Sequence, residues 1–297
     1  MKKLKLLFLV IAMVMTLSLF GCGEPQSSDN PNPKPEPTPE VLPDPEPGTE
    51  TVYIEHNGRT VEAEVFRPNS SKFSVVIFSH GYNGYRDDFK SSANFLMENG
   101  IGAITFTFCG SGARDTSGFA TTDMTLVTEK EDLLAVMDYA KALKWFDGNL
   151  FLCGGSQGGM VSAMAGEERM NDIRGMALLF PGFCIPTDWN AWYPDDDKIP
   201  VTIPWWGVDL GRNFVLSLRD IDIYANMASF TKPVLLMHGT NDNIVPLSYS
   251  QRASETYPNA ELVIYQGEGH GFSPATMTRV NDKLLDFIDN TLLNKEI

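Results

Sequence analysis

The sequence predicts an α/β domain in which a mostly parallel sheet is covered by helices on both faces. Short, continuous apolar runs of the kind found in strands buried on both faces alternate with longer segments of helical periodicity. Several of these runs lead directly into glycine-rich turns. The contents of 43% hydrophobic and 21% charged residues are ordinary for a globular chain, so the 297 residues can build a substantial core.

The chain from residue 51 onward holds the expected elements in order. Strands at 52–54 and 61–66 flank Asn57-Gly58, a dipeptide typical of a tight hairpin turn. Further strands are expected at the short apolar runs 75–78, 101–108, 150–153, 177–180, 234–237 and 262–265. Helices are expected at 87–99, 126–145, 160–170, 249–257 and 276–293.

Residues 183–219 interrupt this alternation. A long insertion inside a compact domain is uncommon and often functional, so we interpret it as a cap over the C-terminal edge of the sheet, where open α/β sheets bind ligands. Its tryptophans are the candidate substrate-binding residues: Trp189, Trp192, Trp205 and Trp206. The alternative is a small aromatic core that packs the insertion down. The run of three aspartates at 195–197 is interpreted as a solvated loop, and we expect no metal site.

The first residues of the chain are expected to lie outside the fold. Three lysines precede an apolar run of about 15 residues, which has the form of a secretory signal and is short for a membrane span. The run ends in Leu19-Phe20-Gly21-Cys22, which resembles a bacterial lipobox and implies cleavage before Cys22 and lipidation of its sulfur. The alternatives are an uncleaved anchor or plain secretion.

An acidic segment with nine prolines follows at 22–50, and it cannot bury enough apolar surface to fold. We interpret it as an extended linker. The expected organisation is therefore a signal peptide at 1–21, the lipidated Cys22 with its linker at 22–50, and a domain at 51–297. This organisation places the protein outside the cytoplasm, with a lipid anchor in the bacterial cell membrane.

Charge and cysteine content exclude some classes of protein. The formal net charge of -15 argues against nucleic acid as a partner, because phosphate binding needs clustered Lys and Arg. Four cysteines are too few for a disulfide scaffold and show no zinc-type spacing. Cys153 is expected to be a buried thiol, whereas Cys109 and Cys184 fall near strand ends, so a bridge between them is an open alternative.

The segment Gly154-x-Ser156-x-Gly158 is the strongest chemical signal. It matches the pattern of a strained strand-to-helix turn that exposes a nucleophilic serine, and glycines on both sides allow neighbouring backbone to pass closely. An apolar run precedes the motif and a helix-compatible segment follows it. Ser156 is therefore the candidate nucleophile.

A nucleophilic serine needs a base and an acid that orients the base. Of the four histidines, His270 follows both Ser156 and Asp242, which gives the chain order serine, acid, histidine. Each of these three residues lies just after an expected strand, so all three can meet at one edge of the sheet. Asp220 and Asp222 are the substitutes for Asp242.

The developing oxyanion needs hydrogen-bond donors. One candidate is the backbone N–H of Gln157, directly after the nucleophile. The other is the N–H of Tyr82, in the loop after the strand at 75–78. We expect His80 to brace this loop.

Four motifs together resemble the α/β-hydrolase superfamily: Ser79-His80-Gly81-Tyr82, Gly154-Gly155-Ser156-Gln157-Gly158-Gly159, His238-Gly239-Thr240-Asn241-Asp242 and Gly269-His270-Gly271-Phe272. They are most similar to those of bacterial cinnamoyl/feruloyl esterases and serine-aminopeptidase-like hydrolases. The resemblance covers about residues 51–297. It implies an eight-stranded sheet, a cap between the sixth strand and the acid, and hydrolysis of carboxylic esters through an acyl-enzyme. One departure is Cys109-Gly110-Ser111-Gly112, where relatives often carry an Arg-Gly-x-Gly-x-Ser-like segment, and Arg114 is the candidate to supply that charge.

The leading hypothesis is a serine carboxylesterase without a cofactor. The aromatic cap favours an aromatic or short acyl group, for instance a feruloyl or cinnamoyl ester, either small or linked to a polysaccharide. One alternative is a serine peptidase of the aminopeptidase-like branch. Another is a non-catalytic binding lipoprotein at the cell surface.

Overall fold

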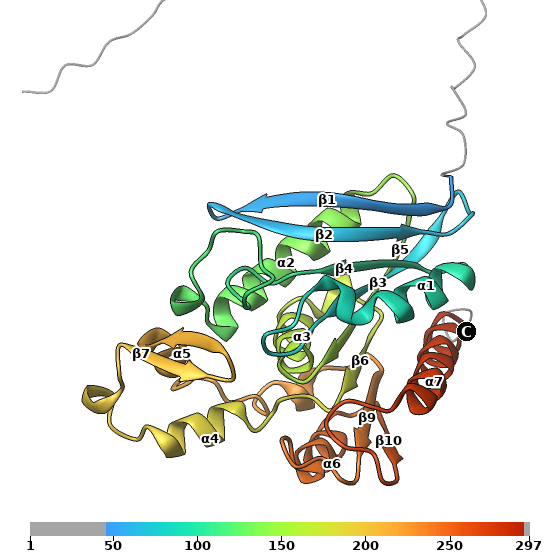
Figure 1. The fold of residues 1–297 in the computed structure, drawn as a ribbon. Helices are drawn as coiled ribbons and strands as arrows, with labels where there is room; N and C mark the ends of the chain where they lie inside the picture. Colours follow the sequence, from blue (N-terminus) through green and yellow to red (C-terminus); the bar gives the residue numbers. More distant parts are fainter. Residues whose placement is uncertain (1–45, 294–297) are drawn as a thin grey trace, which may run out of the picture. The chain divides into compact units, whose positions relative to one another are not determined.

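The computed structural model describes residues 46–293, and these contain an eight-stranded sheet in the order β1-β2-β4-β3-β5-β6-β9-β10 (Figure 1). Only β2 runs against its neighbours, and every other pair in the sheet is parallel. The strands are β1 Gly48–His56, β2 Arg59–Arg67, β3 Phe73–Ser79, β4 Gly102–Phe106, β5 Phe146–Gly155, β6 Gly175–Leu179, β9 Val234–Gly239 and β10 Ala260–Tyr265. The α/β fold class with a mostly parallel eight-stranded sheet is thus confirmed.

The helices cover both faces of the sheet. They are α1 Lys90–Glu98, α2 Leu126–Ala142, α3 Gln157–Glu168, α4 Ile185–Trp192, α5 Arg212–Ser217, α6 Leu247–Thr256 and α7 Pro274–Leu293. Helices α1 and α7 share one buried cluster with the sheet, whereas α2, α3 and α6 contribute to the other.

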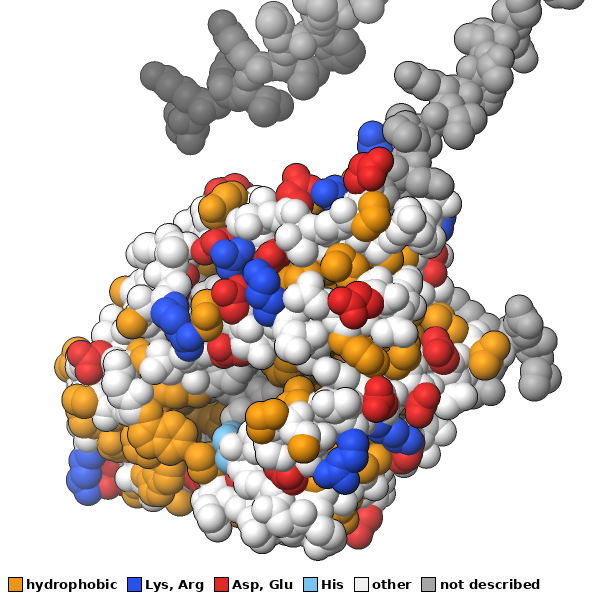
Figure 2. Space-filling model, turned by 45° about the vertical axis from the view of Figure 1, so that its right-hand side comes forward, with side chains coloured by type: hydrophobic (Ala, Val, Ile, Leu, Met, Phe, Trp, Pro, Cys, Tyr) orange, Lys and Arg blue, Asp and Glu red, His pale blue; other side chains and the backbone are white. Residues whose placement is uncertain are grey.

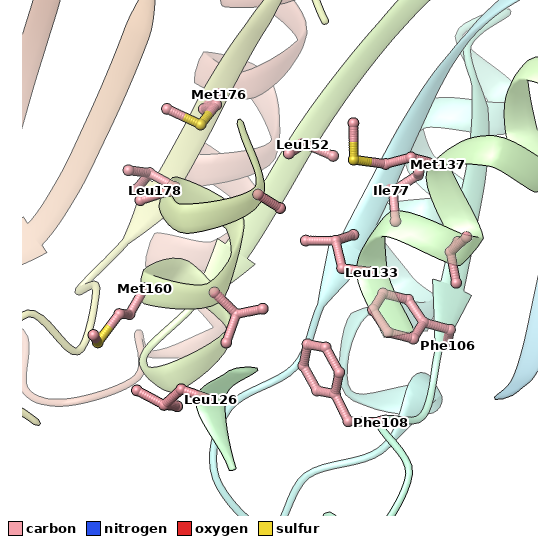
Figure 3. Close-up of a cluster of buried hydrophobic side chains, with 14 of the residues drawn as sticks. Ile77, Phe106, Phe108, Leu126, Leu133, Met137, Leu152, Met160, Met176 and Leu178 are labelled. Carbon is pink, nitrogen blue, oxygen red and sulfur yellow. The ribbon is translucent and has the colours of Figure 1, made fainter. Parts of the chain in front are cut away.

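Alternation along the central strands explains these two clusters. Ile77 of β3 and Leu152 of β5 face α2 and α3, while the next residues along the strands, Phe78 and Cys153, face α1 and α7. Because successive strand side chains point to opposite faces, continuous apolar runs are what a sheet covered on both sides requires. Figure 3 shows Ile77 and Leu152 beside Leu133 and Met137 of α2.

The hairpin expected at the start of the domain is present. Asn57 and Gly58 both have positive φ, 46° and 74°, as a type I′ turn requires. Strand β1 begins at Gly48, so three residues that we expected to belong to the linker pair with β2 instead. The expected signal peptide, Cys22 and the linker up to residue 45 lie outside the described residues. Within residues 46–293, no helix is long and apolar enough to cross a membrane.

The cap lies between β6 and β9 and has more regular structure than the sequence indicated. It consists of α4, a 3-10 helix at Asp196–Lys198, the two-stranded hairpin of β7 Thr202–Trp205 and β8 Val208–Gly211, and α5. Trp189 is buried at its centre and packs edge-on against Trp205 and Phe214, with ring centroids 5.0 and 5.1 Å apart. The aromatic mini-core therefore exists, and the same tryptophans also face a cavity described below.

The cysteine side chains are all unpaired among the described residues, so the alternative of a Cys109–Cys184 bridge is wrong. The Cys109 thiol lies 3.6 Å from the Thr60 carbonyl oxygen of β2, and the Cys184 thiol lies 4.0 Å from the Ile244 carbonyl oxygen. The two residues thus sit in different parts of the core. Burial raises the pKa of each of these thiols to about 12, which leaves them unreactive.

Candidate active site

Ser156 stands on a sharp turn between β5 and α3. Its φ of 53° and ψ of -123° are strained for a residue with a side chain, and they lift the hydroxyl away from the strand. A Cβ on Gly158 would collide with the backbone of Ser79 and His80, and one on Gly154 would collide with Gly158. The glycines around Ser156 are therefore required by close backbone packing, as the motif predicted.

Three side chains from three loops meet at this turn. His270 Nε2 lies 2.9 Å from the Ser156 hydroxyl, and His270 Nδ1 lies 2.8 Å from Asp242 Oδ2. Asp242 follows β9 and His270 follows β10, so the carboxyl ends of parallel strands bring them to one edge of the sheet. Asp242 is the acid in contact with His270, rather than Asp220 or Asp222.

Asp242 is held in its charged form by four groups. Its Oδ1 accepts hydrogen bonds from the backbone N–H groups of Ile244 and Val245, at 2.9 and 2.8 Å. His238 Nε2 lies 3.2 Å from Oδ2, in addition to the contact with His270. Burial raises the pKa of the carboxyl, but these hydrogen bonds outweigh burial and leave the pKa well below its usual range. A fixed carboxylate can orient the His270 ring and stabilise its protonated form.

His238 is a residue whose role the sequence did not indicate. It is fully buried, with Nδ1 2.7 Å from the Ser250 hydroxyl and Nε2 2.9 Å from the Val245 carbonyl oxygen. It therefore ties the loop that carries Asp242 to the start of α6. The motif at 238–242 contained the signal, because a histidine ending a buried strand must find polar partners.

The two candidate oxyanion donors border the serine. Gln157 begins α3, so its N–H has no acceptor within the helix. Residue 81, which directly precedes Tyr82, lies against the serine, because a Cβ there would be 3.3 Å from the Ser156 Cβ and 3.8 Å from its hydroxyl oxygen. Tyr82 and Gln157 both line the cavity that opens at Ser156.

His80 braces this loop from behind. It is buried, its Nδ1 lies 2.8 Å from the Gly81 carbonyl oxygen, and its Nε2 accepts the N–H of Phe108 at 3.1 Å. Burial lowers the pKa of His80 to about 4, so the ring is neutral at ordinary pH. Arg114 also supports the loop, since it donates to the Asn83 carbonyl oxygen at 3.2 Å and lies over the Tyr85 ring.

A cavity of about 390 Å³ extends from Ser156 under the cap. It is lined by all four expected tryptophans, together with Phe214, Ile185, Val245 and others. Trp189 is buried, whereas Trp192 and Trp206 are 51% and 58% exposed at the rim. Figure 2 shows a hollow bordered by hydrophobic side chains, with a histidine at its edge.

Asp188 is the one charged side chain among the described residues that line this cavity. It precedes Trp189 in the first turn of α4 and lies near the thiol of Cys184. The sequence did not single it out, because an acidic residue in the first turn of a helix is common. Within residues 46–293, no cluster of three or more His, Cys, Asp or Glu side chains could hold a metal ion.

The eight-stranded sheet and the residues at its edge define the class of protein as an α/β hydrolase. More particularly, the chain belongs to the prolyl oligopeptidase family, whose model matches residues 88–295. That range contains the serine, the acid and the histidine described above.

Solved structures share the α/β-hydrolase fold. Est1E from Butyrivibrio proteoclasticus, in its complex with ferulic acid, is 27% identical, with a TM-score of 0.74 over 80% of this chain and 99% of that one. Mouse alpha/beta hydrolase domain-containing protein 10 is 19% identical, with a TM-score of 0.69 over 81% of this chain and 99% of that one, which shows the fold alone.

The curated relatives match over shorter stretches. The non-heme chloroperoxidase CPO-A1 of Kitasatospora aureofaciens is 35% identical over 29% of this chain and 34% of its own length. The bifunctional esterase/perhydrolase DCH of Acinetobacter calcoaceticus is 28% identical over 30% of this chain and 35% of its own length. The chain thus spans about a third of the length of these two relatives.

Proposed function

We propose that the protein is a serine carboxylesterase. Ser156 attacks the ester carbonyl while His270 takes its proton and Asp242 stabilises the imidazolium. The backbone N–H groups of Gln157 and Tyr82 stabilise the oxyanion. The alcohol leaves with the proton from His270, and water then hydrolyses the acyl-enzyme by the same steps in reverse order.

The observation that carries the proposal is the continuous chain of contacts from Ser156 through His270 to Asp242 at the mouth of a cavity. The serine reaches its base at 2.9 Å and the base reaches a carboxylate at 2.8 Å. These distances are within the range for proton transfer. The strained backbone of Ser156 is a second support, because such strain persists mainly where function needs it.

The substrate that fits best is an ester with an aromatic acyl group, such as a hydroxycinnamate. A cavity lined by four tryptophans and a phenylalanine can enclose a flat ring by stacking and edge contacts. Asp188 is placed among these apolar residues and can accept a hydrogen bond from a phenolic hydroxyl. Est1E, whose solved complex contains ferulic acid, supports the same class.

The core claim is tested with Ser156→Ala and p-nitrophenyl esters, and with fluorophosphonate labelling. We expect kcat to fall by about 10³-fold or more and labelling to disappear. Ser162→Ala, in helix α3 directly after the Ser156 turn but buried away from the cavity, is the matched control that should retain both. Turnover by Ser156→Ala equal to that of the unmodified protein would refute the nucleophile. An unlabelled native protein would favour the binding lipoprotein instead.

A serine peptidase is the second candidate, favoured by the match to the prolyl oligopeptidase family. The same side chains can cleave amides. Asp188 would then have to bind a substrate amine alone, since it is the one charged side chain among the described residues of the cavity. A panel of methyl ferulate, short acyl esters and aminoacyl amides decides between the two, because a peptidase would prefer the amides.

We further propose that the protein is attached to the outer side of a bacterial cell membrane through lipidated Cys22. The support is the sequence of residues 1–22, with its basic start, apolar run and lipobox-like end. Metabolic labelling with a palmitate analogue tests this proposal. Cys22→Ser should lose the label and leave the membrane fraction, and label retained by that variant would contradict it.

A further inference from the structure

A buried glutamate lies behind the two residues proposed to stabilise the oxyanion. Glu129, in the first turn of α2, is 1% exposed, and its two carboxyl oxygens lie 2.9 and 2.8 Å from Nε2 of Gln157. Gln157 is itself 3% exposed and follows Ser156 directly. Burial raises the pKa of the Tyr82 hydroxyl, and the charge of Glu129 adds to this rise. Glu129 thus contacts the side chain of one oxyanion residue and acts electrostatically on the other.

The partners of Glu129 differ from those of the other buried acid on α2. Asp132 is paired with Arg59 at 3.0 Å and with His56 at 2.6 Å, and it accepts the N–H of Cys109. No ion pair joins Glu129 to a cationic side chain within residues 46–293, and its side-chain partner is the neutral Gln157 amide. A buried carboxylate without a counter-charge is costly, so the protonated form is favoured.

The surroundings of Glu129 add no compensating charge. The neighbouring elements supply Asp132 on its own helix, the Tyr82 hydroxyl after β3 and the Gln157 amide on α3. Arg59 and His56 of the first hairpin pair with Asp132, and Arg212 of α5 donates to the Ile199 carbonyl oxygen. Burial, together with the charge of Asp132, raises the pKa of Glu129 to about 8, although the hydrogen bond from Gln157 lowers it.

We propose that Glu129 is a positioning residue for the oxyanion hole, which must stay protonated for full activity. As an acid it accepts the Gln157 amide hydrogen bond and fixes the first residue of α3, whose N–H faces the oxyanion. As a carboxylate it would place a negative charge behind both donors, which would disfavour the negative transition state. The inference rests on the proposed esterase function.

The test measures kcat as a function of pH on the alkaline side, with p-nitrophenyl acetate as substrate and buffer blanks subtracted. We call the fall of kcat at high pH the alkaline limb. For the unmodified protein kcat should fall about tenfold between about pH 7 and about pH 9, following one ionisation. Glu129→Gln keeps a carbonyl acceptor for Gln157 but cannot ionise, so its kcat should stay level over this range. A merely structural role would leave the two profiles parallel.

A second variant tests the same contact from the other side. Gln157→Leu keeps the backbone N–H but removes the amide that lowers the pKa of Glu129, so the alkaline limb should move to higher pH. Glu167→Gln is the matched control. Glu167 is also largely buried with a raised pKa, of about 7, but it bonds the Tyr257 hydroxyl away from the cavity. In Glu167→Gln, kcat should therefore fall at the same alkaline pH as in the unmodified protein.

The outcomes separate this inference from the esterase proposal. If Ser156→Ala is inactive but Glu129→Gln shows the same alkaline fall as the unmodified protein, the positioning role is wrong and the esterase stands. An unmoved limb in Gln157→Leu also overturns the role. If Ser156→Ala remains active, the esterase proposal fails first, and the positioning role fails with it. Circular dichroism of each variant shows whether it is folded.

Discussion

The hydroxyl of Tyr82 donates a hydrogen bond to the backbone carbonyl of Trp205 at 2.8 Å. This contact joins the loop after β3, which carries a proposed oxyanion donor, to the tip of the cap hairpin. Asn83 Nδ2 makes a second link, to the Trp206 carbonyl oxygen at 3.3 Å. Two hydrogen bonds therefore join the cap hairpin to the loop that carries a proposed oxyanion donor. Removing one of them should change the kinetic constants.

Tyr82→Phe removes the first link but keeps the backbone N–H. We expect KM for aromatic esters to rise by about five- to tenfold, because the hairpin loses one hydrogen bond worth about 1 kcal/mol, while kcat changes little. Steady-state kinetics with methyl ferulate measure both constants. Tyr53→Phe, on the exposed face of β1, is the control. A loss confined to kcat would show that the hydroxyl acts on the chemistry instead.

Asp188→Asn tests the recognition of a phenolic hydroxyl. The side chain keeps its size but becomes a weaker acceptor, so kcat/KM for methyl ferulate should fall by about tenfold. Methyl cinnamate has no hydroxyl, and its kcat/KM should change little. An equal loss of kcat/KM for both esters would mean that Asp188 supports the structure of the cap and does not bind the phenolic hydroxyl.

Substitution of a cap tryptophan should affect stability or substrate binding according to how deeply its side chain is buried. Trp189→Ala removes a side chain that is 4% exposed and should lower the free energy of unfolding by about 3–5 kcal/mol. Trp206→Ala removes a side chain that is 58% exposed and should leave stability nearly unchanged while raising KM for aromatic esters. Urea unfolding and steady-state kinetics measure the two effects. A large stability loss in Trp206→Ala would make its role structural.

The stability of the fold should fall as pH rises. Burial raises the pKa of Glu129 to about 8 and that of Glu167 to about 7, so the folded protein binds more protons than the unfolded chain. The stability linked to each proton is fully present below the ordinary glutamate pKa of 4.5 and is lost as pH rises through these values. Thermal unfolding from about pH 5 to about pH 8.5 measures the slope. The double variant Glu129→Gln/Glu167→Gln should flatten it, and an unchanged slope would contradict the assignment.

Sequence patterns predicted the eight strands of the large sheet, though not the cap hairpin, and placed Ser156, Asp242 and His270 after three of them. Parallel strands end at a common edge, so residues just after three such runs had to lie near one another. Chain order was informative for the base, because His270 follows both Ser156 and Asp242. The boundary at residue 51 was less accurate, because Gly48–Glu50 look like linker in composition and become strand only by pairing with β2.

Other features depend on contacts between distant segments. Nothing near Asp188 in the chain shows that it faces a cavity, since Trp205, Phe214 and Val245 complete the wall from three other places. The state of Cys109 and Cys184 likewise followed only from where β4 and α4 lie. The role of His238 depends on Ser250, twelve residues away.

The α/β class, the order of the elements and the candidate catalytic side chains therefore followed from the sequence. Periodicity and local motifs report which backbone conformation a segment favours. Tertiary structure alone decided that His270 Nε2 lies 2.9 Å from Ser156, that a cavity opens beside them, and that the buried Glu129 contacts the Gln157 amide, with its pKa raised by burial. Distances and pKa values arise from burial and from neighbours that folding supplies, and neither can be read from a segment considered alone.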